Sequence, residues 1–115
     1  MRTQYGWVEI GNVRYHHDVI IHANQSVRKR SKKKARRFRE WYGHTPLTED
    51  EIAFLKSENP DIVYIGTGQY DALPITLRAL RFLSDYPTII RTTPEIVEML
   101  ARESRPFVAV LHVSG

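Results

Sequence analysis

A chain of 115 residues with 42% hydrophobic residues and a net charge of +4 is long enough for one globular domain, which we expect to span residues 1–115. The absence of cysteine excludes disulfides, zinc–thiolate sites and cysteine nucleophiles. No apolar run is long enough to cross a bilayer and the first residues lack the apolar region of a signal peptide, which predicts a cytoplasmic protein without a membrane partner.

The first segments are predicted to form antiparallel β-structure. A strand over residues 7–10 is followed by the turn signal Gly11-Asn12 and a longer strand over residues 13–22. His16 and His17 are adjacent on this strand and are expected to point to opposite faces. Asp18 opens the apolar run "DVIIH"; if it faces inward, an Arg or Lys of the next segment is its expected partner in a catalytic or structural ion pair, because a lone buried carboxylate is costly.

A basic segment follows, with nine Arg and Lys residues in twelve positions and no acid among them. They are Arg28, Lys29, Arg30, Lys32, Lys33, Lys34, Arg36, Arg37 and Arg39. The rest of the chain carries a charge of −5, so an acidic body bears one basic segment. The spacing of Ala35, Phe38 and Trp41 is partly helical. Two interpretations remain open: binding of nucleic acid or another polyanion, or a solvated connection that contacts acidic surface of this chain or a second copy.

The remaining sequence alternates helices and strands. Helices are predicted over residues 48–57, 73–84 and 94–103, and strands over residues 61–66, 88–93 and 105–115. Thr48 and Glu51 form a capping box at the first helix, and Thr93 is expected to cap the last. The second predicted helix has apolar residues along one side, at Leu73, Leu77, Leu80 and Leu83. The third has them on one face, at Ile96, Val97, Leu100 and Ala101.

This order predicts an α/β fold in which strands and helices alternate. Successive strands joined by helices form crossover connections, which make the sheet parallel at least in part. Ile62, Ile89 and Val108 are therefore expected to lie side by side in one sheet.

With these elements placed, the chain resembles the Mth-like family of uncharacterised proteins, also called domain of unknown function four-nine-eight. The resemblance rests on the order of "GNVRYHHDVIIHANQSV", the basic segment, "PDIVYIGTG", "TTPEIVEML" and "FVAVLHVSG". The family includes a mitochondrial complex I assembly factor and the adipogenesis-associated Mth-domain protein. The resemblance implies a mixed sheet flanked by helices, with an N-terminal antiparallel hairpin as an extra layer. It implies no established enzymatic activity.

Two positions depart from the family's usual pattern. Members commonly have Gly-Thr-x-His after the basic segment, where this chain has Gly43-His44-Thr45, and many end in Thr-Cys, where it has Ser114-Gly115. Roles that depend on that histidine or thiol therefore do not carry over.

The turn after the 61–66 strand is the predicted place for a small-molecule or anion site. Ligands of open α/β sheets bind beyond the carboxyl ends of the strands, and glycine lets backbone approach them. The candidate residues are Gly66, Thr67, Gly68, Gln69, Tyr70 and Asp71, with Arg91, Thr92 and Thr93 from the neighbouring strand end.

No catalytic motif occurs, and the five histidines are dispersed, so we expect no metal and no cofactor. The leading prediction is a non-enzymatic interaction or assembly module with a protein partner or a second copy. A ligand-binding protein or enzyme using Gly66-Thr67-Gly68, and nonspecific nucleic-acid binding through residues 28–39, are the alternatives.

Overall fold

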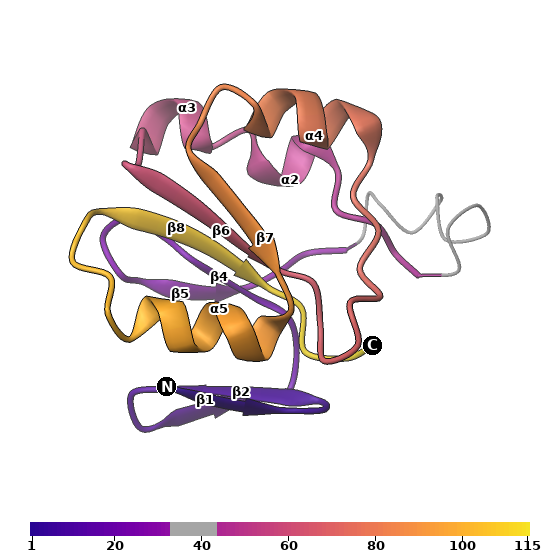
Figure 1. Cartoon of the computed structure of the whole chain (residues 1–115), viewed down its shortest axis with the longest axis vertical. Coiled ribbons are helices and arrows are strands. Elements are labelled where there is room, and N and C mark those ends of the chain that lie inside the picture. Colours follow the sequence, from indigo (N-terminus) through magenta and orange to yellow (C-terminus); the bar gives the residue numbers. More distant parts are fainter. Residues whose placement is uncertain (33–43) are drawn as a thin grey trace.

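The structure is a computed structural model that describes residues 1–32 and 44–115 and divides the strands between two sheets (Figure 1). An antiparallel three-stranded sheet contains β1 (Arg2–Gln4), β2 (Trp7–Ile10) and β3 (Val13–Tyr15). A five-stranded sheet has the order β5-β4-β8-β6-β7 and contains β4 (Val19–Ile21), β5 (Val27–Lys29), β6 (Ile62–Gly66), β7 (Thr88–Arg91) and β8 (Phe107–Leu111). Strands β6, β7 and β8 are parallel, and β4 runs antiparallel to β8 and β5. The mixed α/β fold is thus confirmed, with Ile62, Ile89 and Val108 on neighbouring strands.

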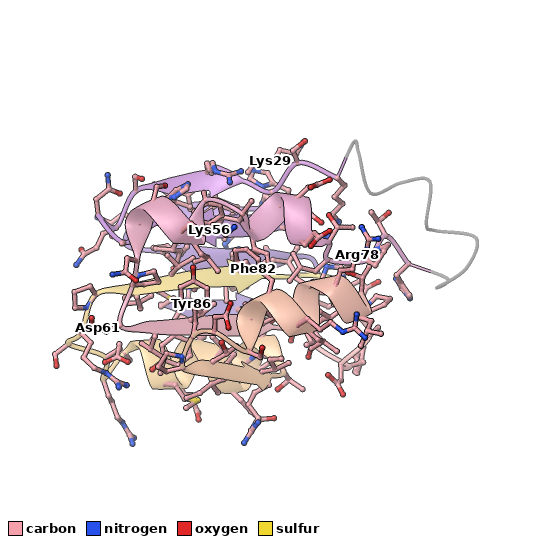
Figure 2. The ribbon with its side chains drawn as sticks, turned by 90° about the horizontal axis from the view of Figure 1, so that it is seen from above. Lys29, Lys56, Asp61, Arg78, Phe82 and Tyr86 are labelled. Carbon is pink, nitrogen blue, oxygen red and sulfur yellow. The ribbon has the colours of Figure 1, made fainter. Side chains whose placement is uncertain are left out.

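In the described part of the chain, four helices lie on the five-stranded sheet. They are α2 (Glu49–Ile52), α3 (Leu55–Glu58), α4 (Leu77–Leu83) and α5 (Thr93–Leu100). Figure 1 shows α2, α3 and α4 on one side of the sheet, and α5 on the other, with the three-stranded sheet beyond α5. Figure 2 looks onto the outer surface of the first group, where Phe82 stacks on Tyr86 at a ring-centroid distance of 5.8 Å and Lys56 lies 5.7 Å from the Phe82 ring.

Both faces of the five-stranded sheet are buried, and side chains alternate between them. Along β6, Ile62 and Tyr64 pack under α5 and the three-stranded sheet, whereas Val63 and Ile65 pack under α2, α3 and α4. Every residue of β6 is buried, which is typical of a parallel strand covered on both faces.

The prediction of a single strand over residues 13–22 is wrong. It divides into β3 and β4, which belong to different sheets, because the chain bends at His16 and His17. A period-two pattern of apolar residues cannot distinguish one long strand from two short ones joined by a bend. Strands β1 and β5 have little apolar content and were not predicted.

The predicted helices are also longer than the observed ones. The first breaks at Ala53 and Phe54 into α2 and α3. The second begins only at Leu77, because the backbone around Ile75 instead forms a bridge with Leu47. Leu73 is buried before the helix starts, while Leu77 is 61% exposed.

Three smaller differences follow from the same boundaries. Leu80 is 41% exposed, so the predicted apolar side of the second helix is not buried as a whole. Thr92 rather than Thr93 occupies the cap of α5, which ends at Leu100, and Ala101 is exposed.

The helix predicted around Phe38 lies outside the described residues. Of the helices in the described part of the chain, none has the length and apolar content to span a bilayer.

Candidate functional site

Asp18 lies at the bend between β3 and β4 and is buried, with 2% of its surface exposed. Four donors surround its carboxylate. Oδ2 lies 3.0 Å from Arg30 Nη1, 3.1 Å from Lys32 Nζ and 2.7 Å from His112 Nδ1, and Oδ1 accepts from the Val113 amide at 3.0 Å. A carboxylate oxygen offers about two lone-pair positions, so these contacts fully occupy Oδ2 and leave Oδ1 with one further position.

The surroundings of Asp18 hold it ionised. Burial alone would raise its pKa, but the hydrogen bond from His112, the charges of His112 and Lys32 and the Val113 amide outweigh burial and place the pKa far below its usual range. Asp18 is therefore a permanent acceptor at neutral pH and not a proton donor or base.

Arg30 follows β5 and is fully buried. Besides Asp18, its guanidinium donates to Glu51 Oε1 at 2.6 Å, Glu51 Oε2 at 3.2 Å and the Pro46 carbonyl at 2.8 Å. The same Glu51 carboxylate accepts from the Thr48 amide at 2.8 Å in the predicted capping box. Arg30 thus ties the end of β5 to the start of α2, and its expected role in polyanion binding is corrected: all its contacts lie inside the protein.

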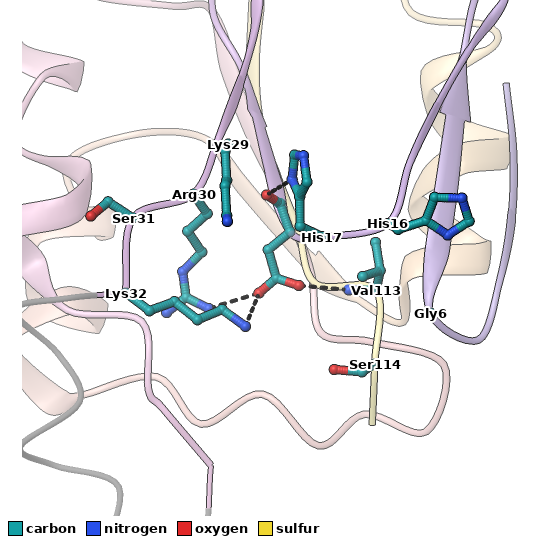
Figure 3. Close-up of a pocket in the computed structure, with 10 residues that line it drawn as sticks. Gly6, His16, His17, Lys29, Arg30, Ser31, Lys32, Val113 and Ser114 are labelled. Carbon is teal, nitrogen blue, oxygen red and sulfur yellow. Dashed lines mark hydrogen bonds and ion pairs between the residues drawn. The ribbon is translucent and has the colours of Figure 1, made fainter.

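A cleft of about 640 Å³ opens beside Asp18 and is called the Asp18 cleft below (Figure 3). Its lining comes from the β1–β2 turn, the bend before β4, the end of β5 and the segment after β8. The lining residues are Gly6, His16, His17, Asp18, Lys29, Arg30, Ser31, Lys32, Val113 and Ser114. Figure 3 shows Lys29, Arg30 and Lys32 on the left of the view, and Val113 and His16 on the right. His16 and His17 both line this cleft and lie on a bend, not on the predicted strand, and Figure 3 shows their rings pointing in different directions.

The Asp18 cleft carries surplus positive charge. The carboxylates of Asp18 and Glu51 balance Arg30 and Lys32. Lys29 has no carboxylate within ion-pair distance among residues 1–32 and 44–115. Its amine is therefore the charge that the described fold leaves unmatched at this cleft.

The other predicted cations divide into two groups. Arg28 points to the opposite face of β5, where its Nε donates to His22 Nε2 at 2.8 Å and its guanidinium lies 5.4 Å from the Phe54 ring centroid. Lys33, Lys34, Arg36, Arg37 and Arg39 lie outside the described residues.

The glycine turn lies at the same end of the sheet but uses its polar groups internally. The amides of Thr67 and Gly68 donate to Arg91 O and Thr93 Oγ1, and that of Tyr70 donates to Gly115 O. Thr67 Oγ1 lies 2.5 Å from Asp71 Oδ1. Because α4 begins only at Leu77, the turn does not lead directly into a helix N-terminus as expected.

The remaining residues predicted at this turn have separate places. Arg91 is exposed and its Nη1 donates to the neighbouring Ile90 carbonyl, and Thr92 Oγ1 donates to Glu95 at the start of α5. The Gln69 side chain donates to Thr3 Oγ1 at 3.1 Å. Tyr70 is 77% exposed.

His112 is the site residue that sequence reasoning missed. It follows β8 directly and is buried, and its Nδ1 carries the proton that Asp18 accepts, since a carboxylate only accepts. Within the described part of the chain, its Nε2 is buried and has no hydrogen-bond partner. The only signal in the sequence was an ionisable residue placed directly after a continuous apolar strand, which predicts neither burial nor Asp18 as partner.

Metal-ligand geometry is not found in residues 1–32 and 44–115. No three His, Asp or Glu side chains there form a group suited to hold an ion. The ring centroids of His44 and His112 are 6.5 Å apart.

Solved structures of other proteins have a similar fold. No family model and no curated protein matches the chain. A conserved hypothetical protein, PH1505 from Pyrococcus horikoshii OT3, superposes with a TM-score of 0.86 and 22% identity over 100% of this chain and 98% of that one. A structure named MT938 gives 0.79 and 27% over 100% and 96%.

A third likeness is more distant. The solution structure of XCC1710 from Xanthomonas campestris has a TM-score of 0.68 and 15% identity over 100% of this chain and 83% of that one. These likenesses show that the whole chain adopts a fold already seen in other proteins.

Proposed function

We propose that the chain is a non-enzymatic binding module whose Asp18 cleft takes a small anionic group, such as a phosphate or a carboxylate. The observation that carries this proposal is that donors inside the protein already engage both oxygens of Asp18. The side chains of the cleft lining that can still offer a donor to a ligand are Lys29, Lys32 and Ser114.

The expected affinity is modest. An ammonium and an anion 4 Å apart near a protein surface attract by about 4 kcal/mol, which corresponds to a dissociation constant of about 1 mM if no other term contributes. Lys29 supplies one such contact, and Lys32, with 31% of its side chain exposed, shares its charge between Asp18 and the cleft.

A binding role is favoured over catalysis by the same geometry. Asp18 is held as an acceptor and is not free to take a proton from a ligand. Among the hydrogen bonds of the described residues, no Ser or Thr hydroxyl donates to a histidine nitrogen, so the arrangement of an activated nucleophile does not occur there.

The Asp18 cleft also replaces the glycine turn as the favoured place for the anion. The amides of Thr67, Gly68 and Tyr70 already donate within the fold, whereas the Lys29 amine has no carboxylate partner in the described residues. The assembly role and the nucleic-acid role remain predictions from the sequence.

The experiment is a titration of isotopically labelled protein with inorganic phosphate, followed by amide chemical shifts. We expect saturable shifts at Gly6, Asp18, Lys29 and Val113 at low salt. Lys29→Ala should weaken binding about fivefold or more, while Lys56→Ala, which removes the same charge from a surface outside the cleft, should leave it unchanged. Equal effects of the two variants, or no saturable shifts, would reject the proposal.

Membership of the Mth-like family is likewise proposed. It is supported by the three-stranded N-terminal sheet packed as an extra layer and by structural neighbours that cover the whole chain and are described as hypothetical. Structures of further family members would test it: the same two-sheet arrangement would support membership, and a different arrangement would contradict it.

A further inference from the structure

Two exposed tyrosines are linked through the backbone to segments that line the Asp18 cleft. Tyr5 is 62% exposed and Tyr70 is 77% exposed, and their ring centroids are 6.1 Å apart with the ring planes inclined by 38°. The rings come from segments 65 residues apart in the sequence, the β1–β2 turn and the turn after β6. Exposed apolar surface of this kind, gathered from separate segments, is typical of a binding surface.

The backbone connects both tyrosines to the lining of the cleft. Tyr5 immediately precedes Gly6, which lines the cleft and donates its amide to the Val113 carbonyl at 2.7 Å. The Tyr70 amide donates to the Gly115 carbonyl at 2.7 Å, next to Ser114, which also lines the cleft. The segment from Val113 to Gly115 therefore borders the cationic cleft. One end of it is hydrogen-bonded to the residue after Tyr5, and the other end is hydrogen-bonded to Tyr70.

The two features complement one another chemically. Lys29 and Lys32 offer ammonium groups to an anion inside the cleft, and the tyrosines offer exposed aromatic faces on segments next to its lining. A ligand that combines a phosphate with a planar ring uses both, since aromatic side chains stack on nucleobases with little dependence on the base. A cleft of about 640 Å³ is within the size range of small-molecule sites.

We propose that the ligand of the Asp18 cleft is a nucleotide unit, with its phosphate beside Lys29 and Lys32 and its base against Tyr5 and Tyr70. This inference rests on the proposed anion-binding function and adds the chemical class of the ligand. A free mononucleotide and the 5′-phosphate end of a nucleic-acid strand share this chemistry.

The test compares two phosphates that differ only by the base. Adenosine monophosphate and ribose 5-phosphate are titrated into the full chain, with affinity read from amide chemical shifts. We expect adenosine monophosphate to bind about tenfold more tightly, the gain typical of one stacked base. Equal affinities overturn the nucleotide inference and leave the anion site standing, whereas no binding of either compound rejects both.

Substitutions of the two tyrosines test where the base binds. Tyr70→Ala should abolish most of the tenfold difference without changing the affinity for ribose 5-phosphate, and Tyr70→Phe, which keeps the ring, should retain it. Tyr70 is largely exposed, so neither change threatens folding. If the tenfold difference persists in both Tyr70→Ala and Tyr5→Ala, the inference is overturned, because the base is then recognised elsewhere.

A last arm identifies the source of the nucleotide unit. A 5′-phosphorylated oligonucleotide of four residues is titrated in parallel with adenosine monophosphate. Tighter binding of the oligonucleotide that weakens in Tyr70→Ala indicates a strand end, and tighter binding of the mononucleotide with the same weakening indicates a free nucleotide. Binding of the oligonucleotide that is insensitive to both Tyr70→Ala and Lys29→Ala counts against the inference.

Discussion

His112 donates from Nδ1 to Asp18 Oδ2 across 2.7 Å and so joins two residues that lie 94 positions apart in the sequence. The same carboxylate also receives Arg30, whose guanidinium continues to Glu51 at the start of α2. One buried acceptor therefore connects the beginning of β4, the end of β5, the end of β8 and a helix on the sheet surface. The floor of the Asp18 cleft is a structural network as well as a candidate ligand site.

The first prediction concerns the charge of Asp18. Asp18→Asn keeps the shape of the side chain but removes one of the two carboxylates that pair with the buried Arg30 in the described residues. We expect it to lower the free energy of unfolding by about 3–5 kcal/mol, the usual cost of breaking a buried ion pair. Urea unfolding followed by circular dichroism measures the change. Glu49→Gln is the matched control, since its ion pair with Arg78 is exposed and should contribute less than about 1 kcal/mol. Similar losses in both variants would show that burial of Asp18 adds nothing.

The second prediction concerns pH. Because the pKa of Asp18 is lowered in the folded protein, its ionised form contributes stability above the unfolded-state value of about 4, and this contribution declines as the pH falls below that value. The difference in unfolding free energy between the native chain and Asp18→Asn should therefore keep its full size down to about pH 5. Below pH 4 it should shrink by about 1.4 kcal/mol per pH unit. A difference that keeps its full size at pH 3 would contradict this explanation.

Much of the fold was predictable because it depends on local pattern. The continuous apolar run of β6, the spacing of Ile96, Val97 and Leu100, and the alternation of strands and helices each predict one element, and the parallel arrangement follows from their order. The division of residues 13–22 between two sheets was not predictable in this way. It depends on the bend at His16 and His17, which is stabilised by contacts of Asp18 with distant residues.

The candidate site was predicted only in part for the same reason. A buried carboxylate required a cationic partner, and Asp18 does meet Arg30. Which of nine cations would be buried is not encoded locally, and His112 carries no local signal of its pairing with Asp18. The glycine turn was placed at the correct end of the sheet, but its engagement with Gly115 depends on the path of the final segment after β8.

The third prediction concerns this close packing at Gly68. Its φ angle is +102°, and a Cβ atom there would lie 2.7 Å from the Ser114 carbonyl oxygen and the Gly115 carbonyl carbon. Gly11 also has a positive φ, of +61°, but nothing lies within 4 Å of its added Cβ. We expect Gly11→Ala to cost about 1–2 kcal/mol from backbone strain alone and Gly68→Ala to cost more, with the final segment displaced. Thermal unfolding of both variants measures the difference, and equal costs would mean that the segment yields freely.

The fourth prediction separates the two roles of Lys32. Lys32→Ala leaves Asp18 with Arg30, His112 and Val113 as donors, so the loss of stability should stay near 1 kcal/mol, well below that of Asp18→Asn. The same change removes an ammonium from the Asp18 cleft and should weaken phosphate binding about as much as Lys29→Ala does. Lys32→Arg should restore both properties in part, because the charge is retained while the geometry changes. Urea unfolding and phosphate titration of one set of variants give the two readouts. If Lys32→Ala destabilises the protein as strongly as Asp18→Asn and leaves phosphate affinity unchanged, Lys32 serves the fold alone and the ligand contacts must be assigned to other donors of the cleft.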